Sequence, residues 1–211
     1  MLECTLNKHH TGLTLWGDYM SLRHLHELVH TVVEGSVVIE DKEGFMLGLA
    51  YDVRKAQEGQ RLKRKSKESP EPPVLYGVEI LWPVMLVQIG LLRHAMGFMP
   101  TSKRDHATMF ELEYVVEAAV DAAVGADAEE IIEWIPRLGA APYPHLDSVL
   151  TSRCVYFIQL PAQKRLQALV PLLESFDPMF DYLSQSGPEK AGRIPQSAFK
   201  EGEDDWPEFE W

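Results

Sequence analysis

Cysteine is scarce in this chain of 211 residues. Only Cys4 and Cys154 occur, far apart in the sequence and without a Cys-x-x-Cys spacing. Such a pair does not indicate the disulfide framework of a small secreted protein. The first residues, Met1 to Lys8, also lack the charged-then-apolar layout of a signal peptide. We therefore expect the protein to reside in a reducing cytoplasm.

A long uninterrupted apolar run is missing as well. The most apolar stretch, residues 80–99, is broken by Pro83, Gln88, Arg93 and His94. A helix that crosses a membrane needs about 20 consecutive apolar residues. This stretch therefore predicts protein core, and we expect no membrane partner.

Positive charge is in the minority. The chain has 20 Lys and Arg against 32 Asp and Glu, which gives a formal net charge of −12 and a pI near 5.1. Nucleic acids and anionic membranes bind proteins through a positive field, so nucleic acid is not expected as a partner. The proportions of 45% hydrophobic and 25% charged residues suit a soluble globular protein.

Most signatures of catalysis are absent. The sequence contains no Gly-x-Ser-x-Gly, no phosphate-binding Gly-x-x-x-x-Gly-Lys and no dinucleotide-binding glycine pattern. What is present is the string His26-Glu27-Leu28-Val29-His30. On a helix, His26 and His30 lie one turn apart and could both bind zinc, while Glu27 could act as a general base. This is the arrangement of a zinc-dependent hydrolase.

A zinc site of this kind needs a third ligand. The downstream candidates form no recognisable continuation of the motif; they are Glu111, Glu113, Glu117, His94 and His106. The helical period places His26 at the edge of the apolar face and Glu27 nearly opposite it. Because a surface helix that carries two histidines without a bound metal would have the same residues, we treat the zinc hydrolase as the alternative hypothesis.

The first 82 residues predict a small sheet with two helices. Strands are expected over residues 2–7, 12–16, 37–40 and 74–82, from alternation or from β-branched residues. A helix should begin after Asp18 or Ser21 and end at Gly35. Residues 45–57 fit both a helical and a strand period, and a helix is our interpretation.

The second half predicts helices. Residues 83–98 are apolar nearly all round, so this helix should lie at the centre of the core. Further helices are expected over residues 107–124, 127–134, 146–160 and 163–176. Pro136 and Gly139 should close the third of these five helices, and Pro171 should kink or break the last. The predicted fold class is α+β, with a small N-terminal antiparallel sheet packed against a largely helical C-terminal part.

Two segments are unusual in charge. Residues 61–67 contain five cations in seven positions and precede a proline-rich connector; the cations are Arg61, Lys63, Arg64, Lys65 and Lys67. Such an arm is either simply solvated or a contact for an acidic partner. The C-terminal residues are acidic and include Trp206, Phe209 and Trp211. Because an exposed tryptophan is costly, these aromatics indicate docking on a partner or on the protein's own body.

Three strings, together with the helix after Asp18, are similar to a known family. They are Thr11–Tyr19, Leu47–Arg54 and Val78–Pro83. The family consists of small, uncharacterised prokaryotic proteins that share a domain of unknown function, and the resemblance covers about the first 120 residues. It implies a cytoplasmic prokaryotic protein of mixed α and β structure, and it supplies neither an activity nor functional residues.

These observations favour a single α+β domain over residues 1–186 and a mobile or docking tail over residues 187–211. The leading hypothesis is a non-enzymatic adaptor or regulatory protein that contacts another protein through the tail and the basic arm. It needs no cofactor, whereas the alternative needs zinc. The sequence does not define the partner or the oligomeric state.

Overall fold

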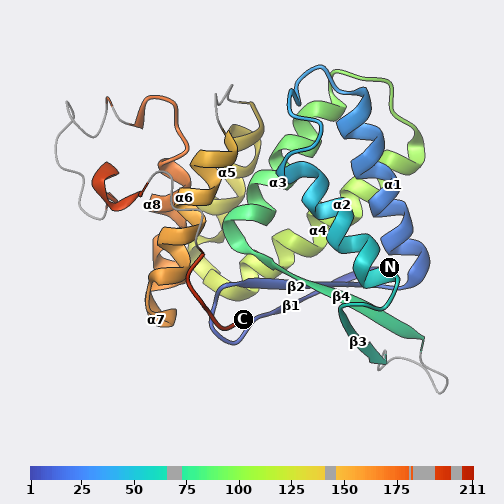
Figure 1. The fold of residues 1–211 in the computed structure, drawn as a ribbon, viewed down its shortest axis with the longest axis horizontal. Helices are drawn as coiled ribbons and strands as arrows, with labels where there is room; N and C mark the ends of the chain where they lie inside the picture. Colours follow the sequence, from blue (N-terminus) through green and yellow to red (C-terminus); the bar gives the residue numbers. More distant parts are fainter. Residues whose placement is uncertain (66–72, 141–145, 181, 183–192, 201–205) are drawn as a thin grey trace.

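The computed structural model describes residues 1–65, 73–140, 146–180, 182, 193–200 and 206–211. A small antiparallel sheet lies along one side, and the helices are stacked on one of its faces (Figure 1). The predicted α+β class, with its N-terminal sheet and largely helical remainder, is confirmed. The strands are β1 (Leu2–Leu6), β2 (Gly12–Gly17), β3 (Leu62–Lys65) and β4 (Val74–Leu81). The longer helices are α1 (Tyr19–Gly35), α2 (Phe45–Gln57), α3 (Trp82–Met96), α4 (Lys103–Val124), α5 (Ala128–Ala140) and α6 (Leu146–Gln159), followed by α7 (Ala162–Arg165) and α8 (Leu169–Glu174).

The strands pair in the order β1-β2-β4-β3. In the central strand, Leu15 stands between Cys4 of β1 and Val78 of β4. Leu13 and Leu15 are fully buried in the main core, and since side chains alternate along a strand, Trp16 points to the opposite face. The sheet therefore has an inner face toward the helices and an outer face that includes Trp16.

Helix α3 lies in the core, as its apolar sequence predicted. Most of its side chains are buried, Trp82 and Leu86 among the most completely. Its closest neighbour is α5, and the two backbones approach at Gly90 and Gly139, where a Cβ atom on Gly90 would lie 3.1 Å from the Gly139 nitrogen. Only residues without a side chain permit this approach.

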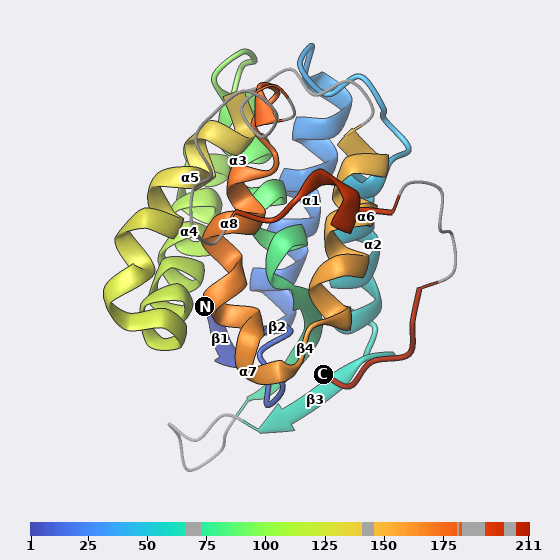
Figure 2. The ribbon, with the colours of Figure 1, turned by 90° about the vertical axis from the view of Figure 1, so that its left-hand side faces the viewer.

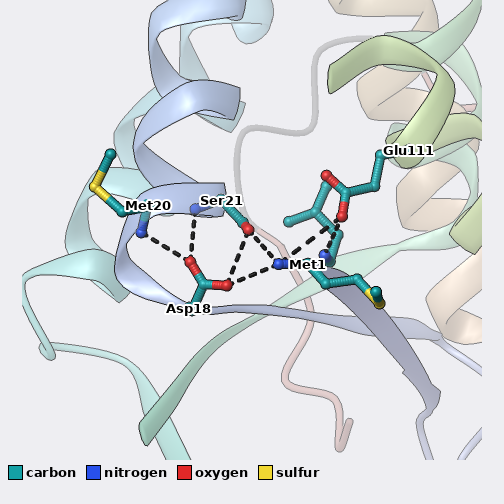
Figure 3. Close-up of polar contacts among 6 residues, drawn as sticks. Met1, Asp18, Met20, Ser21 and Glu111 are labelled. Carbon is teal, nitrogen blue, oxygen red and sulfur yellow. Dashed lines mark hydrogen bonds and ion pairs between the residues drawn. The ribbon is translucent and has the colours of Figure 1, made fainter. Parts of the chain in front are cut away.

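Helix α1 begins at an N-cap that also binds the N-terminal ammonium group. The Asp18 carboxylate accepts hydrogen bonds from the backbone N–H groups of Met20 (2.9 Å) and Ser21 (2.8 Å). The ammonium group of Met1 donates to Asp18 (2.7 Å) and to the Ser21 hydroxyl (2.5 Å), and it lies 3.9 Å from Glu111 of α4 (Figure 3). These contacts tie the start of β1 to two helices.

Two predicted local structures are wrong. Residues 37–40 do not form a strand, because the Ser36 hydroxyl accepts from the N–H groups of Val38 (3.0 Å) and Ile39 (3.4 Å) and turns the chain around the end of α1. Pro136 does not end α5, which continues to Ala140. The buried side chains of Ile135 and Leu138 on α5 compensate for the hydrogen bond that a proline cannot donate.

Two other segments, residues 45–57 and 163–176, are helical as expected, the second with a break. Residues 45–57 form the helix α2, so the helical period prevails there over the strand period. The helix expected over residues 163–176 is divided into α7, a short 3-10 turn and α8. Pro171 lies in the first turn of α8, where its missing N–H has no helical partner to lose.

A carboxyl pair connects the segment before α2 to the start of α6. Asp41 and Asp147 share a hydrogen bond, and both crowd Gly44, where a Cβ atom would lie 2.5 Å from Asp41 and 3.0 Å from Asp147. Burial raises the pKa of Asp147, and the charge of Asp41 and the shared hydrogen bond raise it further, against a hydrogen bond from the Phe45 backbone that lowers it. The native protein therefore binds this proton more tightly than the unfolded chain does.

We expect stability to reflect this raised pKa. The stabilising contribution is fully present below the unfolded-state pKa of about 3.9 and is lost as the pH rises through the native pKa of Asp147. Asp41→Asn removes the repulsion but keeps the carbonyl oxygen that accepts from Glu43 (3.0 Å). The variant should therefore be more stable at pH 7, by about 0.5 kcal/mol. Urea unfolding of both proteins from pH 3 to 8 measures this, and a difference independent of pH would contradict it.

Candidate protein-interaction site

The basic run contains a strand that the sequence did not reveal. Residues 61–67 were expected to form a basic arm, either solvated or in contact with an acidic partner, but Leu62–Lys65 pair with β4 in the register Leu62 to Gly77 and Lys65 to Val74. Lys67 lies outside the described residues. We call residues 61–65 the basic edge.

The two edges of the sheet differ. On β1, the outward N–H of Leu2 donates to the Glu111 carboxylate (2.7 Å), and α4 lies beside the strand. On the opposite side β3 is the last strand, and Figure 2 shows it at the margin of the sheet. Leu62, Lys63 and Lys65 are all exposed there. The described part of the chain therefore covers one edge of the sheet and places no strand beside the other.

On the outer face, Arg64 is fully engaged. Its guanidinium lies 4.5 Å from the centre of the Trp16 ring and forms an ion pair with Glu3. The indole N–H donates to the Thr5 hydroxyl (2.8 Å). Beneath the ring is Gly77, where a Cβ atom would lie 2.5 Å from the indole. Arg64 therefore covers the Trp16 ring and is paired with Glu3, so it is not a free cation.

On the inner face, the cations differ in their partners. Arg61 forms an ion pair with Asp52 (2.8 Å), and the hydrogen bond that its guanidinium donates to the Asp52 carboxylate raises the pKa of Arg61. Lys63 lies 5.9 Å from the centre of the Tyr76 ring. Lys65 has no ion pair or hydrogen bond within the described residues. Lys63 and Lys65 thus have no anionic partner in the part of the chain that the structure describes and, two residues apart on a strand, share one face.

Helix α2 extends the positive surface. Tyr51 is half exposed, and its ring is approached by the cations of Arg54 (5.6 Å) and Lys55 (5.5 Å). Residues 51–65 hold six cations against two anions. These residues therefore carry a surplus of four positive charges. Since the whole chain has a net charge of −12, the rest of the chain is more negative than −12 by these four charges. We call α2 from Tyr51 onward together with the basic edge the basic face.

The C-terminal aromatics are not all free. Phe209 and Trp211 are partly buried against the core, with ring centroids 5.0 Å apart. Between them, Glu210 lies 3.3 Å from His9 in the β1–β2 turn. Trp206 is 43% exposed. Of the three aromatics that we considered for partner binding, two contact this protein's own body.

A second C-terminal contact lies upstream. Ile194 and Phe199 are buried, and the Phe199 ring has the Arg153 guanidinium 4.1 Å above it. The rings of Tyr156 and Phe180 meet it edge-on, with centroids at 5.4 Å and 6.3 Å. Residues 193–200 therefore pack against α6 and the segment after α8.

The His-Glu-x-x-His string forms part of α1, as predicted. The rings of His26 and His30 are 4.4 Å apart. Burial lowers the pKa of His26, and the charges of His30 and Arg54 lower it further. Glu27 is exposed and forms an ion pair with Arg23 (2.8 Å), whose hydrogen bond lowers the Glu27 pKa. A general base needs the opposite shift.

The downstream candidates do not complete a zinc site. Glu111 binds the Leu2 N–H, and Glu113 holds Arg93 through two hydrogen bonds, one of them 2.6 Å to Nε. Among the described residues, no three His, Cys, Asp or Glu side chains come together in a way that could hold a metal ion. Within the described chain, Glu27 is therefore held by Arg23 and belongs to no cluster of metal-ligand side chains.

No helix within the described ranges combines the length and the apolar character that crossing a membrane requires.

Comparison with known proteins supplies a family. The model of a domain of unknown function, DUF6904, matches residues 2–211. The chain belongs to this family. No curated protein and no solved structure matches the chain.

Membership of DUF6904 confirms the resemblance to an uncharacterised family. The match includes the basic edge and the C-terminal residues, and so extends far beyond the first 120 residues or so. DUF6904 itself is defined without an activity, so the chemistry must be inferred from this chain's own surface.

Within this DUF6904 chain, sequence reasoning missed the stack of Arg64, Trp16 and Glu3. The available signal was the pairing potential of residues 62–65 with 74–77, two short segments close in sequence. The density of positive charge concealed it, because lysine-rich segments are usually read as solvated arms.

Proposed function

We propose that this protein is a non-enzymatic protein-interaction module that binds an acidic segment of another protein at the basic edge. One observation carries the proposal: among the described residues, Lys63 and Lys65 have no anionic partner, and no strand lies on the outer side of the strand from which they project. An open strand edge offers backbone donors and acceptors to a peptide. A cationic edge selects an acidic one by charge complementarity.

The surroundings favour a peptide over a nucleic acid. Beyond the basic face the chain is strongly acidic, which repels an extended polyphosphate. The exposed apolar side chains of Leu62 (40%) and Val74 (44%) lie beside the cations. Such a mixture suits a segment that has both acidic and apolar residues.

The C-terminal residues have a different role in this proposal. Ile194 and Phe199 are buried, and Phe209 and Trp211 pack on the core. These contacts support docking on the protein's own body, next to the domain that we place at residues 1–186. Trp206 remains the one C-terminal aromatic exposed enough to meet a partner directly.

Charge reversal tests the proposed function. We expect Lys63→Glu combined with Lys65→Glu to weaken binding of a fluorescein-labelled hexapeptide of alternating glutamate and leucine by about tenfold or more, because two attractive charge pairs become repulsive. The matched control reverses two cations outside the basic face, Lys103→Glu with Arg104→Glu on α4. Fluorescence anisotropy gives both affinities. Equal affinities of the two variants, or no binding by the unmodified protein, would refute the proposal.

A further inference from the structure

A more specific inference, which rests on the proposed function, concerns the way in which the partner binds. We infer that the acidic segment joins the sheet as a further strand beside β3, with acidic side chains at alternate positions and apolar side chains between them. Three features support this inference: the state of the two sheet edges, the register of the basic edge, and the repulsion between two copies of β3.

The backbone groups at the two edges of the sheet differ in their partners. Every second residue of an edge strand turns its N–H and C=O away from the sheet. On β1 such a group is satisfied, since Leu2 donates to Glu111 and α4 lies alongside. On β3 the exposed side has no neighbouring strand in the described chain. A segment that extends this sheet therefore has to add to β3.

The side chains of an added strand would meet those of β3. Lys63 and Lys65 face the inner side, where no anion of the described chain is paired with them. Leu62 and Arg64 face the outer side, where Arg64 is already paired with Glu3 and Leu62 is 40% exposed. Side chains of adjacent strands meet those on the same face. Acidic residues of the segment therefore meet the two lysines, and the intervening apolar residues meet Leu62.

The positive charge of β3 excludes the simplest alternative, a second copy of this chain. Antiparallel pairing of two β3 strands would bring lysine and arginine side chains opposite one another, and like charges directly across strands are destabilising. Lysine on edge strands is a common device against self-pairing. The same charges that oppose a second β3 attract an acidic strand, so the occupant is a partner with alternating acidic and apolar residues.

Isomeric peptides test the alternation. The first probe is the hexapeptide of alternating glutamate and leucine, and the second is its block isomer, three glutamates followed by three leucines, with the same composition and charge. We expect the alternating peptide to bind about tenfold more tightly to the full chain, since only alternation places every glutamate on the lysine side. Leu62→Ala should reduce this preference, whereas Phe98→Ala, which changes an exposed residue outside the basic face, should not.

N-methylation of the peptide tests the backbone pairing. Methyl groups on one set of alternate amides point toward β3 and should abolish binding, while methyl groups on the other set point away and should be tolerated. Equal affinity of the two isomers, or indifference to both methylation patterns, would overturn strand addition while leaving the charge-dependent binding intact. Failure of Lys63→Glu with Lys65→Glu to weaken the alternating peptide would overturn the proposed function and this inference together.

Discussion

Gly90→Ala should lower the free energy of unfolding by about 3 kcal/mol, the upper range for overpacking a close-packed core. A methyl group at this position of α3 would overlap the carbonyl oxygen of Ile135 on α5 and would lie 3.1 Å from the Gly139 nitrogen. Both obstacles are backbone atoms, which no rotamer change can move. The helices would have to separate, and the core contacts between α3 and α5 would loosen.

The same substitution at Gly48 is the matched control. Gly48 lies in α2, and a Cβ atom there meets nothing within 4 Å. Because alanine is the better helix former, Gly48→Ala should raise the free energy of unfolding by about 0.5–1 kcal/mol. Urea unfolding monitored by circular dichroism compares the two. Similar effects of the two substitutions would show that α3 and α5 do not approach as closely as described.

Phe199→Ala should cost about 3 kcal/mol, as expected for a buried phenylalanine reduced to alanine. The ring is 5% exposed and lies against the Arg153 guanidinium and the edges of Tyr156 and Phe180. Its removal takes away the contacts that fix residues 193–200 on α6. We therefore expect faster cleavage of this segment by protease, in addition to the loss of global stability.

Phe98→Ala provides the comparison for that experiment. Phe98 is 58% exposed, and its ring contacts His94 with centroids 4.9 Å apart. Surface substitutions of this kind change stability by about 0.5 kcal/mol or less. Thermal unfolding and limited proteolysis distinguish the two variants. If Phe199→Ala were as mild as Phe98→Ala, the C-terminal segment would be a loose tail and not part of the packed body.

Much of the fold follows from local pattern. The alternation of residues 2–7 and 12–16 predicted β1 and β2, because one face of the sheet is buried under the helices. The apolar character of residues 83–98 predicted the buried helix α3. In each case, burial of one face of the strand or of the whole helix determines which positions are apolar. The order of apolar and polar residues in the sequence therefore predicts the element.

The remainder depended on individual side-chain contacts, some local and some between distant residues. The turn at residues 37–39 follows from the Ser36 hydroxyl and from Lys42, whose ammonium group donates to the Val33 carbonyl (2.7 Å). The continuation of α5 through Pro136 depends on packing against α3. The Asp41–Asp147 pair joins residues more than 100 positions apart. The alternation of apolar and polar residues contains none of this information.

The sequence indicated the positive charge of the candidate site, but it did not predict that these residues form a strand. The cations Arg61, Lys63, Arg64 and Lys65 were identified from sequence as a contact for an acidic partner. Their division into engaged and unengaged groups required the strand register, which puts Arg64 over Trp16 and the two lysines on the other face. The histidine pair of α1 was located correctly as well, but the Arg23–Glu27 ion pair beside it could not be anticipated from the motif.

The uneven charge of the molecule also matters before any contact is made. With six cations within residues 51–65 and an acidic remainder, the protein is an electric dipole whose positive end is the basic face. A dipole turns in the field of an approaching charge, and such steering raises the rate of productive encounter. The lysines should therefore govern mainly how fast an acidic partner associates, while Leu62 and the backbone of β3 govern how long it stays.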